Sequence, residues 1–263
     1  MIWHGGPILP SAATAAIFWG TSWNPSTYTG DKIAGMDSWY QGVGSTSLYS
    51  SPYAQTDDEY CASSSCASGT VGSGITYSGH LVDTSAAPSH APRTSQVLGE
   101  VCKEITNPLS NGYYAVYVDT KRGNAGYCAW HSWGSCGGTP VQFAFFFNLD
   151  GDPGCDPQST ITSYSQGLAA LANVSGHELS EARTDPRGNA WYDSSGNENA
   201  DKCAWSFGST FVNFPSNNTN WKIQGNWSNY AYTNNLGYPN RSGQNGCIDG
   251  GGTYNQAFPN AAP

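Results

Sequence analysis

The feature that most constrains this chain is a set of eight cysteines in a glycine-rich sequence of 263 residues. An even number of cysteines is typical of disulfides formed in an oxidising compartment. No Cys-x-x-Cys motif occurs, which disfavours a four-cysteine zinc site. We therefore expect four disulfides in a secreted, extracellular protein. The sequence spacing favours the pairs Cys61–Cys66, Cys128–Cys136 and Cys203–Cys247.

The charge balance limits the partners. Only 11% of residues are charged, and 10 Lys and Arg against 19 Asp and Glu leave a formal charge of -9. Such a surface disfavours nucleic acids and anionic membranes, and no stretch approaches the ~20 apolar residues that span a bilayer. The first residues do not read as a secretory signal, so we expect a mature form written without its signal peptide. We also expect a monomer.

Apolar periodicity predicts the main elements. The expected helices cover 31–42, 94–106 and 163–184, and the expected strands cover 14–20, 75–83, 113–119, 141–148, 210–214 and 221–225. The strand 141–148 is apolar on both faces and should be central in a sheet. These elements predict one α+β domain over 1–263. It has sheet and helices over about 1–160, a long helix within 161–186, and a strand- and loop-rich lobe over 187–263.

The third helix carries the most informative pattern, His177-Glu178-Leu179-Ser180-Glu181. Positions i and i+4 share one face of a helix, so His177 and Glu181 can bind the same Zn²⁺ ion. Glu178 can then act as general base toward a metal-bound water, which is the logic of zinc peptidases with one histidine replaced by glutamate. The alternative is a solvated helix face on which Glu178, Glu181 and Arg183 form ion pairs.

A catalytic zinc site needs a third protein ligand. The candidates are Asp201, Glu198, Asp185 and His131. Each also has an ordinary interpretation, since Asp185 precedes a proline at the end of the helix and Glu198 and Asp201 occupy a polar loop. We place His131 on a loop closed by Cys128–Cys136, just before the central strand.

Several short motifs together resemble the plant exordium, or phosphate-induced, secreted proteins and their bacterial homologues. The matching segments are Trp3-His4-Gly5-Gly6-Pro7, Ile17-Phe18-Trp19-Gly20 with Trp23, Cys128-Ala129-Trp130-His131, His177-Glu178-x-x-Glu181 with Asp185-Pro186, Asn189-Ala190-Trp191-Tyr192 and Glu198-x-x-Asp201-x-Cys203. The resemblance implies a secreted protein with a zincin-like helix. The plant members carry asparagine at the position of Asp185. The resemblance therefore favours Glu198, Asp201 or His131, rather than Asp185, as the third ligand.

These residues predict a secreted zinc metalloendopeptidase. The metal is held by His177, Glu181 and a third ligand, for which Asp201 is the first candidate. It polarises the carbonyl of a peptide or protein substrate. Glu178 takes a proton from the metal-bound water and returns it to the leaving amine. The main alternative is a non-catalytic extracellular protein that binds a cell-wall glycan or a protein partner, with a structural metal site or none.

Two further enzyme classes and two further sites remain open. His131, His177 and Glu181 would form the ligand set of a non-haem iron oxygenase, and Glu178 with Glu181 would form the carboxylate pair of a glycoside hydrolase. A turn with three carboxylates predicts a possible Ca²⁺ site, formed by Asp150, Asp152 and Asp156. Three aromatic residues are candidates for a substrate cleft, namely Trp130, Trp191 and Tyr192.

Overall fold

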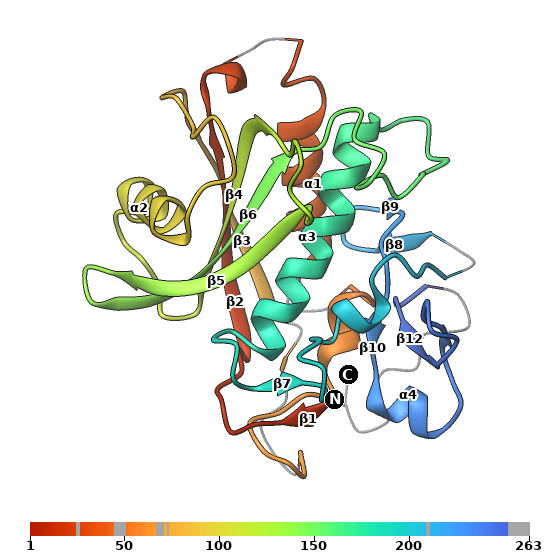
Figure 1. Cartoon of the computed structure of the whole chain (residues 1–263). Coiled ribbons are helices and arrows are strands. Elements are labelled where there is room, and N and C mark those ends of the chain that lie inside the picture. Colours follow the sequence, from red (N-terminus) through yellow and green to blue (C-terminus); the bar gives the residue numbers. More distant parts are fainter. Residues whose placement is uncertain (25–26, 45–50, 67–70, 73, 209–210, 252–263) are drawn as a thin grey trace.

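A mixed five-stranded sheet forms the centre of the protein (Figure 1). The computed structural model describes residues 1–24, 27–44, 51–66, 71–72, 74–208 and 211–251. The strands lie in the order β3-β2-β4-β6-β5. They comprise β2 (Ser11–Trp19), β3 (Gly74–Asp83), β4 (Gly112–Lys121), β5 (Ala129–Cys136) and β6 (Thr139–Asn148). Neighbouring strands are parallel except β5, which is an edge strand antiparallel to β6.

Helices cover both faces of this sheet. Helices α1 (Lys32–Val43) and α3 (Gln166–Thr184) pack together on one face, and α2 (Thr94–Glu104) lies on the other (Figure 1). The seven residues from Val141 to Phe147 are all buried, so the central position predicted for 141–148 is confirmed. The three predicted helices are also confirmed, with small differences at their ends. The fold is α+β, as expected.

The chain after α3 forms short elements. Strand β7 (Trp191–Tyr192) pairs with β1 (Ile2–Trp3), and β8 (Val212–Phe214) pairs with β9 (Thr219–Trp221). A small sheet joins β10 (Asn226–Trp227), β12 (Asn245–Ile248) and β11 (Tyr238–Pro239), beside the short helix α4 (Asn229–Thr233). The 3₁₀ turns are η1 (Thr21–Trp23), η2 (Ala54–Asp57) and η3 (Asp201–Cys203).

Two of the strand predictions differ in their extent. The strand predicted over 210–214 begins at Val212 in the structure. Residue 210, where the prediction starts, lies outside the described residues. The strand predicted over 221–225 instead ends at Trp221. Within the described residues, no helix is both long and apolar enough to cross a bilayer.

The eight cysteines form four disulfides, as predicted, but one expected pair is wrong. The bonds join Cys61–Cys66, Cys102–Cys136, Cys128–Cys155 and Cys203–Cys247. The predicted pair Cys128–Cys136 cannot form because Cys128 immediately precedes β5 and Cys136 is the last residue of this strand. An extended strand rises ~3.4 Å per residue, which places these cysteines roughly 27 Å apart, far beyond disulfide reach.

Candidate metal centre

Helix α3 is buried over nearly its whole length, which is why its polar residues need partners. The helix begins after Ser165, whose hydroxyl accepts a hydrogen bond from the backbone N–H of Leu168 at 3.1 Å. A Cβ at Gly176 would lie 2.7 Å from the Tyr53 hydroxyl oxygen and 2.9 Å from the Ile223 Cγ2 atom. Glycine at this position therefore lets neighbouring segments pack closely against the helix, one residue before His177.

Three segments supply the polar side chains of the centre. Helix α3 contributes His177, Glu178 and Glu181, and the loop leading into η3 contributes Glu198 and Asp201. A histidine comes from the edge strand, because His131 lies within β5, opposite Ala144 of β6. The prediction that His131 lies on a loop is therefore wrong. The extended backbone of β5 carries this imidazole to the edge of the sheet beside α3.

One set of potential ligands surrounds the first oxygen of Glu181. The His177 Nε2 atom lies 3.0 Å from Glu181 Oε1 and 3.4 Å from Asp201 Oδ1. The backbone N–H of Asp201 also donates to Glu181 Oε1, at 3.0 Å. Together, these contacts bring one imidazole nitrogen and two carboxylates within ligand distance of one position. They are the three residues that the sequence argument placed first.

A second set surrounds the other oxygen of Glu181. The His131 Nε2 atom lies 3.6 Å from Glu181 Oε2 and 3.1 Å from Glu198 Oε2. The side chains of this set are 10%, 4% and 18% exposed, in the order His131, Glu181 and Glu198, whereas Asp201 of the first set is 43% exposed. The second set is therefore the more enclosed of the two.

No known protein family, curated protein or solved structure matches this chain. The chemistry of the centre has to be inferred from its own residues.

Burial and charge crowding govern protonation in the centre. Burial raises the pKa of Glu178 to about 7 and that of Glu181 to about 8, against the opposing effect of His177. Burial lowers the pKa of His131, but Glu198 and Glu181 outweigh it and raise this pKa to about 9. A metal ion binding here would have to displace protons from the imidazole nitrogens.

The first set faces an open cavity of about 250 Å³. His177, Glu178 and Asp201 all contribute to its wall, and the start of β5 forms another part of it. A polar hollow of about 450 Å³, with Lys202 and Arg241 in its wall, also reaches Asp201. Asp201 therefore lies where two hollows meet. A ligand in the larger hollow and one beside Glu178 would be neighbours across this carboxylate.

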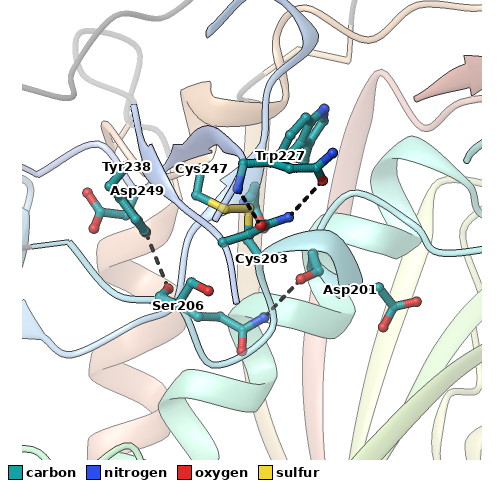
Figure 2. The surroundings of a disulfide bond; sticks show 12 residues. Asp201, Cys203, Ser206, Trp227, Tyr238, Cys247 and Asp249 are labelled. Atoms are coloured by element: carbon teal, nitrogen blue, oxygen red, sulfur yellow. Dashed lines mark hydrogen bonds between the residues drawn. A yellow bond between two sulfur atoms is a disulfide. The ribbon is translucent and has the colours of Figure 1, made fainter. Parts of the chain in front are cut away.

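The position of Asp201 is held by a covalent bond nearby. Asp201 and Cys203 share the turn η3, and Cys203 is bonded to Cys247 of β12 (Figure 2). The carboxylate of Asp201 points away from the sulfur atoms in this view. The disulfide thus ties the ligand-bearing turn to the small C-terminal sheet, which limits the movement of Asp201 relative to α3.

Gln224 is a residue of the centre that the sequence did not reveal. Its Nε2 atom lies 2.7 Å from His177 Nδ1 and 3.3 Å from the carbonyl oxygen of Ala200. This contact holds the ring of His177 with its other nitrogen toward Glu181 and Asp201. A metal ion at that nitrogen would put the ring proton on Nδ1, and the Gln224 amide would have to turn its oxygen toward this proton. Gln224 is 47 residues from His177 in sequence, so local spacing carried no signal for it.

Asp185 has a structural role at the end of α3. Its Oδ1 atom accepts hydrogen bonds from the backbone N–H groups of Asn189 and Ala190, both at 2.7 Å. It belongs to neither set of mutually close ligand atoms.

Neither the predicted calcium turn nor the predicted aromatic cleft gathers around the centre. Asp150 pairs with Lys32 at 2.8 Å and Asp152 with Arg122 at 2.6 Å, so both carboxylates already have cationic partners. Asp156 Oδ1 accepts the backbone N–H of Gln158. The three aromatic residues pack elsewhere: Trp130 against Phe145, Trp191 against Tyr60, and Tyr192 against His4.

Proposed function

We propose that this protein is a secreted metal-dependent peptidase whose catalytic cation is held by His177, Glu181 and Asp201. The observation that carries this proposal is that His177 Nε2 lies against the carboxylates of both Glu181 and Asp201, beside a cavity that Glu178 also lines. One nitrogen and two carboxylate oxygens suit a divalent ion such as Zn²⁺. Such an ion polarises a carbonyl group and makes water a better nucleophile.

The protein's own residues supply the proton transfers. Glu178 removes a proton from the attacking water as the water oxygen bonds to the peptide carbonyl carbon. The carbon–nitrogen bond then breaks, and Glu178 returns the proton to the leaving nitrogen. His177, Glu181 and Asp201 remain ligands throughout. Glu178 is only 5% exposed, so the proton moves within an enclosed space.

An extended peptide is the substrate that suits the walls of the cavity. Cys128 and Ala129, at the start of β5, form part of its lining. Because β5 is the edge strand of the sheet, its outer backbone groups can pair with an added peptide strand. The four disulfides support an extracellular location. The resemblance to exordium-like proteins is consistent with this location and stays a prediction.

The test compares the parent protein with Glu178→Gln and Glu181→Gln. We expect bound zinc in the parent and in Glu178→Gln. Cleavage of a peptide library should fall by a factor of roughly 10²–10⁴ in Glu178→Gln, because only the general base is lost. Glu181→Gln should lose the metal and the activity together. A parent that binds no zinc at neutral pH, or full activity in Glu178→Gln, would contradict the proposal. Zinc binding without cleavage would favour the non-catalytic alternative.

A further inference from the structure

The two carboxylate oxygens of Glu181 face different histidines. Oε1 lies 3.0 Å from His177 Nε2, and Oε2 lies 3.6 Å from His131 Nε2. Each oxygen thus belongs to its own set of ligands, completed by Asp201 on one side and Glu198 on the other. A carboxylate with this arrangement has the geometry of a bridge between two positions.

A single ion cannot bind Glu181, His177 and His131 together in the observed geometry. Two atoms bound to one ion at about 2.1 Å can be at most about 4.2 Å apart. Among the described residues, no set of ligand atoms within 4.8 Å of one another contains both His131 and His177. This separation also argues against the single iron site that would need both histidines.

The second position has one ligand oxygen that lacks a partner. The Oε1 atom of Glu198 is buried and has no hydrogen-bond partner. A buried carboxylate oxygen without a partner is costly. A cation bound between Glu198, Glu181 and His131 would use the free oxygen of Glu198 and remove that cost.

The negative charge of the whole centre also favours the binding of more than one cation. Four carboxylates, those of Glu178, Glu181, Glu198 and Asp201, surround two imidazoles that must be neutral to bind metal. One divalent ion would leave two negative charges uncompensated in a mostly buried cluster. Two divalent ions would balance all four carboxylates.

We propose that the protein binds two divalent cations, one at His177 and Asp201 and one at His131 and Glu198, bridged by Glu181. The proposal rests on the proposed function for the first site and adds the second. Paired catalytic ions typically lie ~3.5–4 Å apart, a spacing that one bridging carboxylate can span. The enclosed second ion would fix Glu181 and β5, while the first remains open to the cavity.

The experiment counts bound zinc by elemental analysis after equilibrium dialysis, in the parent and in His131→Gln, Glu198→Gln and His177→Gln. We expect two equivalents in the parent and one in each variant. Circular dichroism and thermal unfolding without metal verify that each variant folds. The matched control is Glu104→Gln, from another cluster of three carboxylates that already surrounds Lys103, and its count should equal that of the parent.

A second readout tests the bridge itself. A shared carboxylate couples the spins of two Co²⁺ ions, so the electron paramagnetic resonance signal per ion should be weaker in the doubly loaded parent than in His131→Gln. Two equivalents without coupling would overturn the bridge.

The remaining outcomes separate the two proposals. One equivalent in the parent, lost in His177→Gln and kept in His131→Gln, would overturn the second ion and leave the proposed function intact. One equivalent lost only in His131→Gln would overturn both proposals. No bound metal would also overturn both.

Discussion

Helix α3 carries two clusters of buried polar side chains that differ in charge balance. One is the candidate metal centre, with four carboxylates and two histidines. The other, on a different side of the helix, joins Ser180 and Arg183 to Asp57 and Asn199. Arg183 Nη1 donates to Asp57 Oδ2 at 2.8 Å, and Asp57 Oδ1 accepts from Ser180 and Asn199. We call this second group the Asp57 cluster.

This difference distinguishes buried polar residues that stabilise the fold from those available to bind a ligand. In the Asp57 cluster one carboxylate meets one guanidinium, whose Nη1 and Nη2 groups also donate to the carbonyl oxygens of Ala54 and Gly72, while its Nε has no hydrogen-bond partner. In the candidate metal centre negative charge is in excess, and Glu198 keeps an oxygen without a partner. The Asp57 cluster is the more buried of the two, so charge balance rather than burial distinguishes the candidate functional cluster.

The largest effect should come from breaking the Asp57 cluster. Asp57→Asn leaves Arg183 buried without its counter-charge and should lower the free energy of unfolding by about 3–5 kcal/mol. The loss should be the same with zinc and with a chelator, as measured by urea unfolding. The control is Glu104→Gln, because its partner Lys103 is 50% exposed and also pairs with Asp83, so that the change should cost at most ~1 kcal/mol. A zinc-dependent loss in Asp57→Asn would show that the two clusters are not independent.

Glu181→Gln should affect stability in the opposite way to Asp57→Asn, since its effect should depend on zinc. Without metal it should be at least as stable as the parent, because it removes one carboxylate from a crowded, buried group. At a zinc concentration of 100 times the dissociation constant, the parent should gain about 2.7 kcal/mol in unfolding free energy for each bound ion and the variant nothing. Thermal and urea unfolding with and without zinc provide the measurement. Strong destabilisation of the metal-free variant would instead assign Glu181 a structural role.

Gln224→Met tests the support of His177. Replacing a residue that orients a metal-binding histidine typically weakens metal affinity by a factor of about 10–100. We expect such a loss by calorimetric titration with zinc. The metal-free protein should also lose about 1–3 kcal/mol in unfolding free energy, because Gln224 is buried and its side chain bonds the backbone of Ala200 and Trp205. Gln166→Met, near the start of the same helix, is the matched control and should bind zinc as the parent does. Equal affinity in both variants would show that Gln224 does not position His177.

The smallest effect concerns Asp193, a carboxylate on the same lobe as Asp201 that is fully supplied with donors. Burial raises its pKa, but the backbone N–H groups of Ser195 and Asn197 and the Lys202 ammonium outweigh this and lower the pKa to about 2. Its stabilising effect is therefore present above the unfolded pKa of ~3.9 and is lost as pH falls through about 2.

Asp193→Asn should therefore be less stable than the parent by under ~1 kcal/mol at pH 6. The two proteins should converge in stability as the solution is acidified toward pH 2. Urea unfolding at several pH values gives the comparison. A difference that grows on acidification would contradict the lowered pKa.

The sequence predicted those parts of the centre that depend on neighbours along the chain. His177, Glu178 and Glu181 lie on one helix, and helical geometry fixes their spacing before any tertiary contact forms. The same applies to the helices themselves and to the apolar strand 141–148. Asp201 comes first among the third ligands that the sequence allows, but spacing alone leaves Glu198, Asp185 and His131 as competitors.

Long-range packing decided the rest. Arg183, which the sequence allowed as a partner of Glu178 or Glu181, pairs with Asp57, 126 residues away. His131 reaches Glu181 because residues 129–136 form an edge strand rather than a disulfide loop. The extended backbone of this strand also keeps Cys128 and Cys136 too far apart to pair.

The sequence by itself thus determined a disulfide-containing α+β protein with an imidazole and two carboxylates on one helix. Only the tertiary structure decided which cysteines pair, which acid accompanies each histidine, and that Glu181 lies between two ligand sets. The physical reason is distance along the chain. Helix spacing is set over four residues, whereas His131, Glu198 and Gln224 meet α3 only after the strands and the C-terminal loops have packed around it.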